Sequence, residues 1–497
     1  MTKTLRILFG LTVFLGVAVS LLAQPDPRRH HHSVNIVPFV ENGRHLYYLS
    51  WSSSQTENWE HDIYAEIVHF DRQGELVVDR PACRFVGTGD DGAQEPVSVA
   101  LAPRKNVLLS AWEDGTDLSV VVDVRGQLHT PEGQILRPNF QIAGGPDAQH
   151  SAAATHCGHR FLVAYADEAP PARYATVLVK VLDDSTGWVV QTLRLTSDYD
   201  DNWWPVVASD GRRHVLVGWG NGESFSASLL TVEGDSFRTT GPRMVFGNAD
   251  QYFYHVRWVE GAKRFLVAAR DGGATQFSWV DTLGVPSGYA RVPAPITRET
   301  RFAVRWRTRL RACLVAFTTG RDEVALVRSS PDSTRLLQRL TPETHPELSG
   351  LRWVSTGIAL EFVSPTTGET FADGQQRLLI VQNDDASDSL VMRLLSLGSL
   401  SAVRQGRRQA HSWDLVNVAP NPFRDATTVT LRLAYAGRVR VEVFDVRGRK
   451  VATVWNGPLP AGPTRLRFAP EGPAAGVYLL RVAGPGFVRV RKVVRVR

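Results

Sequence analysis

At 497 residues the chain is too long for one ordinary hydrophobic core, so two or more folding units are expected. A hydrophobic fraction of 43% with 21% charged residues excludes a disordered polymer. The three cysteines, Cys83, Cys157 and Cys313, are far apart in the sequence, which excludes a disulfide scaffold and a CxxC metal motif.

The formal charge of +6 is unevenly distributed along the chain. Residues 412–497 hold 15 Lys and Arg against 5 Asp and Glu, so the body that precedes them is net acidic. Because the basic character belongs to this tail, the high isoelectric point does not indicate nucleic acid binding, and we expect no nucleic acid partner.

Residues 1–23 are predicted to be a secretory signal peptide. Lys3 and Arg6 supply positive charge, an apolar run extends from Ile7 to Leu22, and the small residue Ala23 ends it. The alternative is a membrane anchor, but the run is short for a helix that spans a bilayer and no basic cluster abuts it. We therefore expect export to the periplasm and no transmembrane segment after signal cleavage.

One β-rich sequence pattern recurs through residues 24–400: an apolar strand that ends in an aromatic or equivalent residue. Successive copies end 45 to 61 residues apart, at Trp51, Trp112, Tyr165, Trp219, Ala269, Phe317 and Phe362. Repeats of about fifty residues that contain several short strands are typical of β-propeller blades. The sequence therefore predicts an all-β fold whose body is a seven-bladed β-propeller. Six or eight blades are the alternatives, because the last repeats are degenerate.

The first unit also carries a more specific pattern. Trp51 closes one strand, Asp62-Ile-Tyr64 lies in the next, and Asp71-Arg-Gln-Gly74 has the composition of a turn. Over residues 34–245 the chain resembles a repeat common in exported bacterial proteins. The resemblance implies a propeller-like ring and no particular activity.

Residues 401–411 are polar and Arg-rich, lack apolar periodicity, and are predicted to be a linker. Some seven short alternating segments follow in residues 412–497, as in Thr427-Thr-Val-Thr-Leu-Arg-Leu433. This number of strands in so short a segment predicts a C-terminal Ig-like β-sandwich.

This C-terminal module has an Asn-Pro-Phe turn, a Val-Phe-Asp-Val-x-Gly-Arg-x-Val hairpin, a Gly-Val-Tyr strand and a final Lys-bearing strand. The motif residues are Asn421, Pro422, Phe423, Gly448, Arg449, Gly476, Tyr478 and Lys492. In order and position the module resembles the type A C-terminal sorting domain of the type IX secretion system. The resemblance implies two partners, the type IX machinery and its cell-surface peptidase. The alternative is a plain accessory Ig-like domain.

Acidic residues gather in the turns that precede the innermost strand of a repeat or follow its second strand. In a propeller these turns share one rim, where we predict a ligand-binding face. Its predicted residues are Asp91, Asp114, Asp147, Asp167, Asp201, Trp203, Trp204 and Asp271. Such a face suits Ca²⁺, a sugar or a pair of catalytic carboxylates, although Asp also simply builds turns. The two tryptophans offer stacking faces for a ligand or pack between blades.

No catalytic residue is predicted, because the sequence has no nucleophile elbow, P-loop, zinc-protease motif or dinucleotide fingerprint. The metal content stays open, and Ca²⁺ is the one candidate cofactor. We favour a non-enzymatic protein, secreted or attached to the cell surface, that binds a glycan or another protein. The alternatives are a glycan hydrolase or lyase that uses two rim carboxylates, and a structural surface-layer component.

Overall fold

The computed structural model divides the chain into two compact units, Met1–Leu400 and Ser401–Arg497. The residues it describes are 31–54, 61–86, 92–94, 97–116, 122–168, 175–197, 202–221, 224–248, 253–297, 302–320, 322–348, 358–367, 370–384, 389–397, 413–433, 437–445, 449–460, 462–470, 475–484 and 487–496. The predicted signal peptide and linker lie outside these ranges. In the described part of the chain, no helix is long and apolar enough to cross a membrane.

Antiparallel sheets build the first unit, and the described residues form seven of them, named here sheets 1 to 7 in chain order. Sheet 1 contains β1 (His31–Glu41), β2 (Arg44–Ser54), β3 (His61–Phe70) and β4 (Leu76–Val86). Sheet 2 contains β5 (Gly92–Gln94), β6 (Ser98–Ala102), β7 (Val107–Thr116), β8 (Asp123–His129) and β9 (Ile135–Ala143). Sheet 3 contains β10 (Gln149–Cys157), β11 (Arg160–Glu168), β12 (Ala175–Asp183) and β13 (Val189–Arg194).

Sheets 4 to 6 have four strands in chain order, and sheet 7 has three among the described residues. Sheet 4 contains β14 (Trp203–Ser209), β15 (His214–Gly220), β16 (Ser224–Glu233) and β17 (Ser236–Asn248). Sheet 5 contains β18 (Tyr254–Val259), β19 (Arg264–Asp271), β20 (Ala274–Val280) and β21 (Pro286–Val292). Sheet 6 contains β22 (Ala303–Arg307), β23 (Ala312–Gly320), β24 (Glu323–Ser330) and β25 (Ser333–Leu340), and sheet 7 contains β26 (Ile358–Val363), β27 (Arg377–Asp384) and β28 (Ser389–Ser396). Two 3₁₀ turns, η1 (Thr308–Leu310) and η2 (Pro346–Leu348), lie between strands. The prediction of an all-β chain is confirmed, and five of the seven sheets formed by the described residues of this unit are four-stranded and antiparallel.

The recurring aromatic residues lie in the second strand of their sheets. Trp51 is in β2, Trp112 in β7, Tyr165 in β11 and Trp219 in β15, and all four are buried. Because side chains alternate across a strand, an apolar run that covers both faces indicates a sheet buried on both sides. Second strands with this pattern must therefore be sandwiched between neighbouring sheets.

The turn between the first and second strands of sheet 4 explains why the sequence folds back at this point. One carboxylate oxygen of Asp210 accepts hydrogen bonds from the backbone N–H groups of Arg212, Arg213 and His214, at 2.8, 2.7 and 3.0 Å. Gly211 has a φ of 73°, a value that favours glycine. The Asp-Gly step thus closes the hairpin between β14 and β15.

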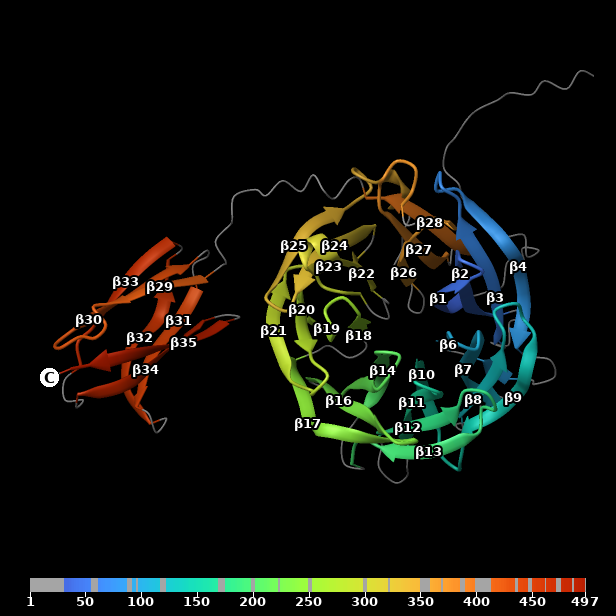
Figure 1. Cartoon of the computed structure of the whole chain (residues 1–497), viewed down its shortest axis with the longest axis horizontal. Helices are drawn as coiled ribbons and strands as arrows, with labels where there is room; N and C mark the ends of the chain where they lie inside the picture. Colours follow the sequence, from blue (N-terminus) through green and yellow to red (C-terminus); the bar gives the residue numbers. More distant parts are fainter. Residues whose placement is uncertain are drawn as a thin grey trace, which may run out of the picture. The chain divides into compact units, whose positions relative to one another are not determined.

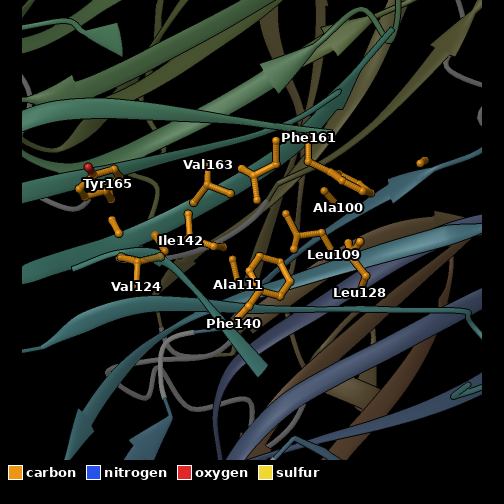
Figure 2. Packing of buried hydrophobic residues seen from close by; sticks show 14 of the residues in the cluster. Ala100, Leu109, Ala111, Val124, Leu128, Phe140, Ile142, Phe161, Val163 and Tyr165 are labelled. Carbon is orange, nitrogen blue, oxygen red and sulfur yellow. The ribbon is translucent and has the colours of Figure 1, made fainter. Parts of the chain in front are cut away.

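Hydrophobic clusters join the sheets in neighbouring pairs. Figure 2 shows the cluster between sheets 2 and 3, where Leu109 and Phe140 of one sheet pack with Phe161 and Tyr165 of the next. Equivalent clusters join each of the remaining pairs of consecutive sheets in the described part of the unit, from sheets 1 and 2 to sheets 6 and 7. Each sheet therefore buries both faces against its neighbours, which no single four-stranded sheet achieves alone.

The first and last sheets of the unit also pack together. One cluster combines Leu49 of sheet 1 with Val381 of sheet 7. The backbone N–H of His45 donates to the carbonyl of Thr366 at 3.0 Å, and the backbone N–H of Ser364 donates to the Tyr47 hydroxyl at 2.7 Å. The sheets consequently follow one another around a propeller-like ring, with β1 beside β26 (Figure 1).

The second unit packs two antiparallel sheets around a separate core. One sheet contains β29 (Trp413–Ala419), β30 (Thr427–Leu433) and β33 (Gly462–Phe468). The other contains β32 (Lys450–Leu459), β31 (Gly437–Asp445), β34 (Gly476–Gly484) and β35 (Phe487–Arg495), in that order. Val429 and Leu431 from the first sheet share a buried cluster with Val441 and Leu480 from the second.

Candidate functional site

The ends of the second strands place the predicted acidic residues on one rim of the ring. Asp114 lies in β7, Asp167 in β11 and Asp271 ends β19, and these are the second strands of sheets 2, 3 and 5. Asp147 comes just before β10, whose residue Gln149 pairs with Asp167 across the ladder. Strands in equivalent positions of consecutive sheets run in the same direction around a ring, so these residues share a rim.

These aspartates contact neighbouring side chains of their own sheets. Asp114 is buried and its carboxylate lies 2.8 Å from Nε of Arg125. The Gln149 amide donates to the Asp167 carboxylate at 3.0 Å and to the backbone carbonyl of Asp147. Asp271 lies 3.2 Å from Nε of Arg291. Asp91 and Asp201 lie outside the described residues.

A different set of side chains meets at this rim. His150, in β10, has Nδ1 at 3.4 Å from a carboxylate oxygen of Glu113 in β7, and Nε2 at 3.7 Å from one of Glu168 in β11. The imidazole also faces Trp203 of β14, with ring centroids 6.0 Å apart and planes at 45°. Three consecutive sheets thus contribute to one group, named here the rim cluster: Glu113, His150, Glu168 and Trp203.

A bulge in β10 aims the histidine at its partners. The ladder between β10 and β11 shifts register between His150 and Ala153, and Ser151 has a φ of 60°. The backbone N–H of Ser151 donates to the Glu113 carboxylate, so the same side chain holds both the bulge and the imidazole. Bulges commonly re-aim a side chain beside a functional site.

The same irregularity recurs in other first strands at this rim. In β14 the register shifts between Trp203 and Val206, with a φ of 54° at Trp204, and in β1 it shifts between His32 and Asn35. In sheet 2 the first strand is divided into β5 and β6, which both pair with β7. Because positive φ costs a residue with a side chain of the order of 1–2 kcal/mol, packing must hold these bends in place.

The two neighbouring tryptophans have different surroundings. Trp203 is half-buried and faces His150, whereas Trp204 packs against the apolar cluster between sheets 4 and 5. The hydroxyl of Tyr254 lies 2.9 and 3.0 Å from the carbonyl oxygens of Trp203 and Trp204. Of the predicted pair, Trp204 therefore packs in the core between sheets 4 and 5, and Trp203 faces the histidine at the rim.

His150 is the titratable group at the centre of the rim cluster. The hydrogen bond to Glu113 raises the pKa of His150 above its ordinary value of 6.5, against the effect of burial, and the charge of Glu168 adds to the increase. The cluster thus places one imidazole between two carboxylates, beside the ring of Trp203. Such a group can donate and accept hydrogen bonds and offers one aromatic face.

Two members of the cluster, Glu113 and Glu168, were absent from the sequence prediction. Each adjoins a predicted aspartate, Asp114 or Asp167, and adjacent residues in a strand point to opposite faces. The sequence placed acidic pairs at strand ends but contained no signal for which member faces the rim. Among the described residues, no group of three or more His, Cys, Asp or Glu side chains could hold a metal ion.

In the second unit, the motif residues are bonded to the end of the chain. The Asn421 amide donates to the carbonyl of Lys492 at 3.0 Å and its oxygen accepts from the N–H of Val494 at 2.8 Å. Phe423 and Tyr478 are buried in the core of this unit.

The hairpin motif residue Arg449 is largely exposed and pairs with Asp445 at 3.1 Å. Gly476 begins β34, Lys492 is exposed in β35, and Gly448 lies outside the described residues. The motif therefore divides into core positions, Phe423 and Tyr478, and exposed positions, among them Asn421, which fastens the turn to β35.

No family model and no curated protein matches this chain. Among solved structures, the subtype N10 neuraminidase-like protein of A/little yellow-shouldered bat/Guatemala is similar at 8% identity, with 73% of this chain and 93% of that chain covered and a TM-score of 0.38. The prolyl oligopeptidase B from Galerina marginata is similar at 8% identity over 70% of this chain, with a TM-score of 0.35, and the match spans 46% of that enzyme. Likenesses at this level carry no functional conclusion.

Proposed function

We propose that this protein is an exported, non-catalytic binding protein whose body is a seven-bladed β-propeller. The seven sheets of the described residues, and the shared core between sheets 1 and 7, support a closed ring of seven blades. The body would be secreted or retained at the cell surface after passage through the periplasm. Its ligand would be a glycan or another protein.

The rim cluster carries the proposal for binding. It combines an aromatic face, a histidine and two carboxylates from three consecutive blades, at a place where strained bends aim the side chains. We favour binding over hydrolysis because Asp114 and Asp271, two of the predicted ligand-binding residues, are each paired with an arginine.

The test of the rim is a screen of the secreted full chain against a glycan array and a peptide library. Trp203→Ala should abolish the binding that the wild-type protein shows, with little change in melting temperature, because this side chain is only half-buried. Trp188→Ala is the matched control, since Trp188 is 66% exposed in a turn of sheet 3 outside the rim cluster. Equal ligand binding by wild type and Trp203→Ala would contradict the proposal.

We further propose that residues 412–497 form an Ig-like sandwich that serves as a type IX secretion sorting domain. The support is the order of its motifs, their position at the end of the chain, and the fastening of Asn421 to β35. The proposed partners are the type IX machinery and its cell-surface peptidase. A peptidase that releases the body would cut in or near residues 401–414.

Deletion of residues 412–497 tests the sorting role. In a host with this secretion system, the truncated protein should accumulate in the periplasm, folded and with its signal removed. Fusion of residues 401–497 to an unrelated periplasmic protein should carry that protein outside the cell. Normal secretion of the truncated chain would leave the accessory-domain alternative.

A further inference from the structure

A groove lies between two neighbouring blades, sheets 4 and 5. Its volume is about 430 Å³, and its lining includes Val245 and Phe246 of β17 together with Asp271, Gln276, Ser287 and Tyr289 of sheet 5. Figure 1 shows β17 and β21 as neighbours on the outer circumference of the ring. A cavity of this size is within the range of small-molecule sites, which is about 300–1,000 Å³.

A bulge in β21 shapes the groove. Phe277 pairs with Ala290 and Trp279 with Ser287, so Ser278 alone faces both Gly288 and Tyr289. Gly288 has a φ of 67°, and a Cβ at this position would lie 2.3 Å from the carbonyl oxygen of Pro331. Glycine is therefore required here, and the bulge leaves Tyr289 at the groove with 50% of its surface exposed.

Polar groups at the groove are held in place before any ligand arrives. Arg291 fixes Asp271 twice, through Nε at 3.2 Å from the carboxylate and through Nη2, which donates to the backbone carbonyl at 2.7 Å. The amide of Gln276 donates to the carbonyl of Phe246 across the groove. Burial raises the pKa of Tyr289 and the charge of Asp271 adds to it, so this hydroxyl stays protonated.

We propose that this groove is a second ligand site, which binds an uncharged saccharide. The ring of Tyr289 and the side chain of Val245 offer apolar surface to the C–H face of a pyranose, while Asp271 and Gln276 offer fixed partners to its hydroxyl groups. Because Arg291 neutralises Asp271, an anionic saccharide gains no net attraction. The open shape suits an internal unit of a longer chain. This site shares no residue with the rim cluster, and its Asp271 belongs to the ligand-binding face that the sequence predicts.

The test uses the full chain on an array of neutral oligosaccharides of glucose, galactose, mannose, xylose and N-acetylhexosamines, with uronate and sulfated glycans alongside. We expect binding to at least one neutral oligosaccharide, weakened tenfold or more by Tyr289→Ala and by Asp271→Asn. Leu283→Ala is the matched control, because Leu283 is 73% exposed in the turn before β21 and does not line the groove. Melting temperatures of all variants should stay near that of the wild type.

Three results would overturn the proposal: no binding to any neutral oligosaccharide, binding only to charged glycans, or equal binding by wild type and Tyr289→Ala. Trp203→Ala separates this site from the rim cluster, because it should leave binding at the groove unchanged. If Asp271→Asn lowers the melting temperature, Tyr289→Ala decides alone, since its half-exposed side chain contributes little to folding.

Discussion

Strand β10 carries a histidine near each end, and the two side chains differ in exposure and in their charged neighbours. His150 lies at the rim with 27% of its side chain exposed, between two carboxylates from different strands. His156 lies towards the opposite rim with 6% exposed, and its Nε2 is 3.0 Å from the carboxylate of Asp184. Exposure and the number of nearby charges decide which end can meet a ligand.

Burial lowers the pKa of His156, and the bond to Asp184 does not compensate. Burial alone would raise the pKa of Asp184, but hydrogen bonds from Lys105 and His156 lower it overall. His156 is therefore neutral and donates to an ionised Asp184, and Lys105 balances the charge of that carboxylate. This end of β10 is a structural network that links turns of sheets 2 and 3, whereas His150 is poised to carry charge.

The largest expected effect comes from breaking the network at the buried end. Asp184→Asn removes the charge that faces Lys105, and we expect it to lower the free energy of unfolding by about 2 kcal/mol, because a charge-assisted hydrogen bond is lost. Urea denaturation at pH 7.5 measures it. A loss below about 0.5 kcal/mol would show that the network does not stabilise the ring.

A smaller effect is expected from the backbone bend at the rim. Ser151→Val places a β-branched residue at a φ of 60°, which should cost about 1–2 kcal/mol. Ser151→Gly is the matched control and should keep or raise stability, since glycine adopts this conformation freely. Thermal unfolding of the two variants would contradict the account if valine were tolerated as well as glycine.

The smallest effect on stability is expected at the rim carboxylate itself. Glu113→Gln keeps the acceptor for the N–H of Ser151, so the free energy of unfolding should change by less than about 1 kcal/mol. The pKa of His150 should fall, because its strongest charged partner is gone. A large loss of stability would contradict this account, because both ends of β10 would then serve the fold.

The repeat could be predicted from sequence because it rests on local pattern. Trp112 and Trp219 end apolar runs that cover both faces of a strand, and turn residues such as Asp210 and Gly211 separate the runs. Burial of both faces then requires a neighbouring sheet on each side. The closing contact between Leu49 and Val381 is a long-range pairing, and no local pattern encodes it.

The rim cluster and the groove could not be predicted for a different reason. Both depend on bulges, at Ser151 and at Gly288, which change the side to which the following residues point. The sequence prediction named Asp114 and Asp167 and not their neighbours Glu113 and Glu168, because an acidic pair carries no signal for which member faces the rim. Tyr289 had no sequence signal, because a tyrosine in an outer strand is ordinary until a bulge exposes it.

The most direct test of the contrast between the two ends is the titration of both histidines in the full-length protein. Carbon-13 labelled histidine, with His150→Gln and His156→Gln used to assign the signals, gives both pKa values by NMR. The account predicts that His150 titrates above 6.5 and His156 below it. The contribution of His150 to stability is then complete below about pH 6.5 and is lost as the pH rises through its raised pKa. The contribution of His156 is complete above about pH 6.5 and is lost as the pH falls through its lowered pKa. Equal pKa values, or the reverse order, would contradict the assignment of one end of β10 to a ligand and the other to the fold.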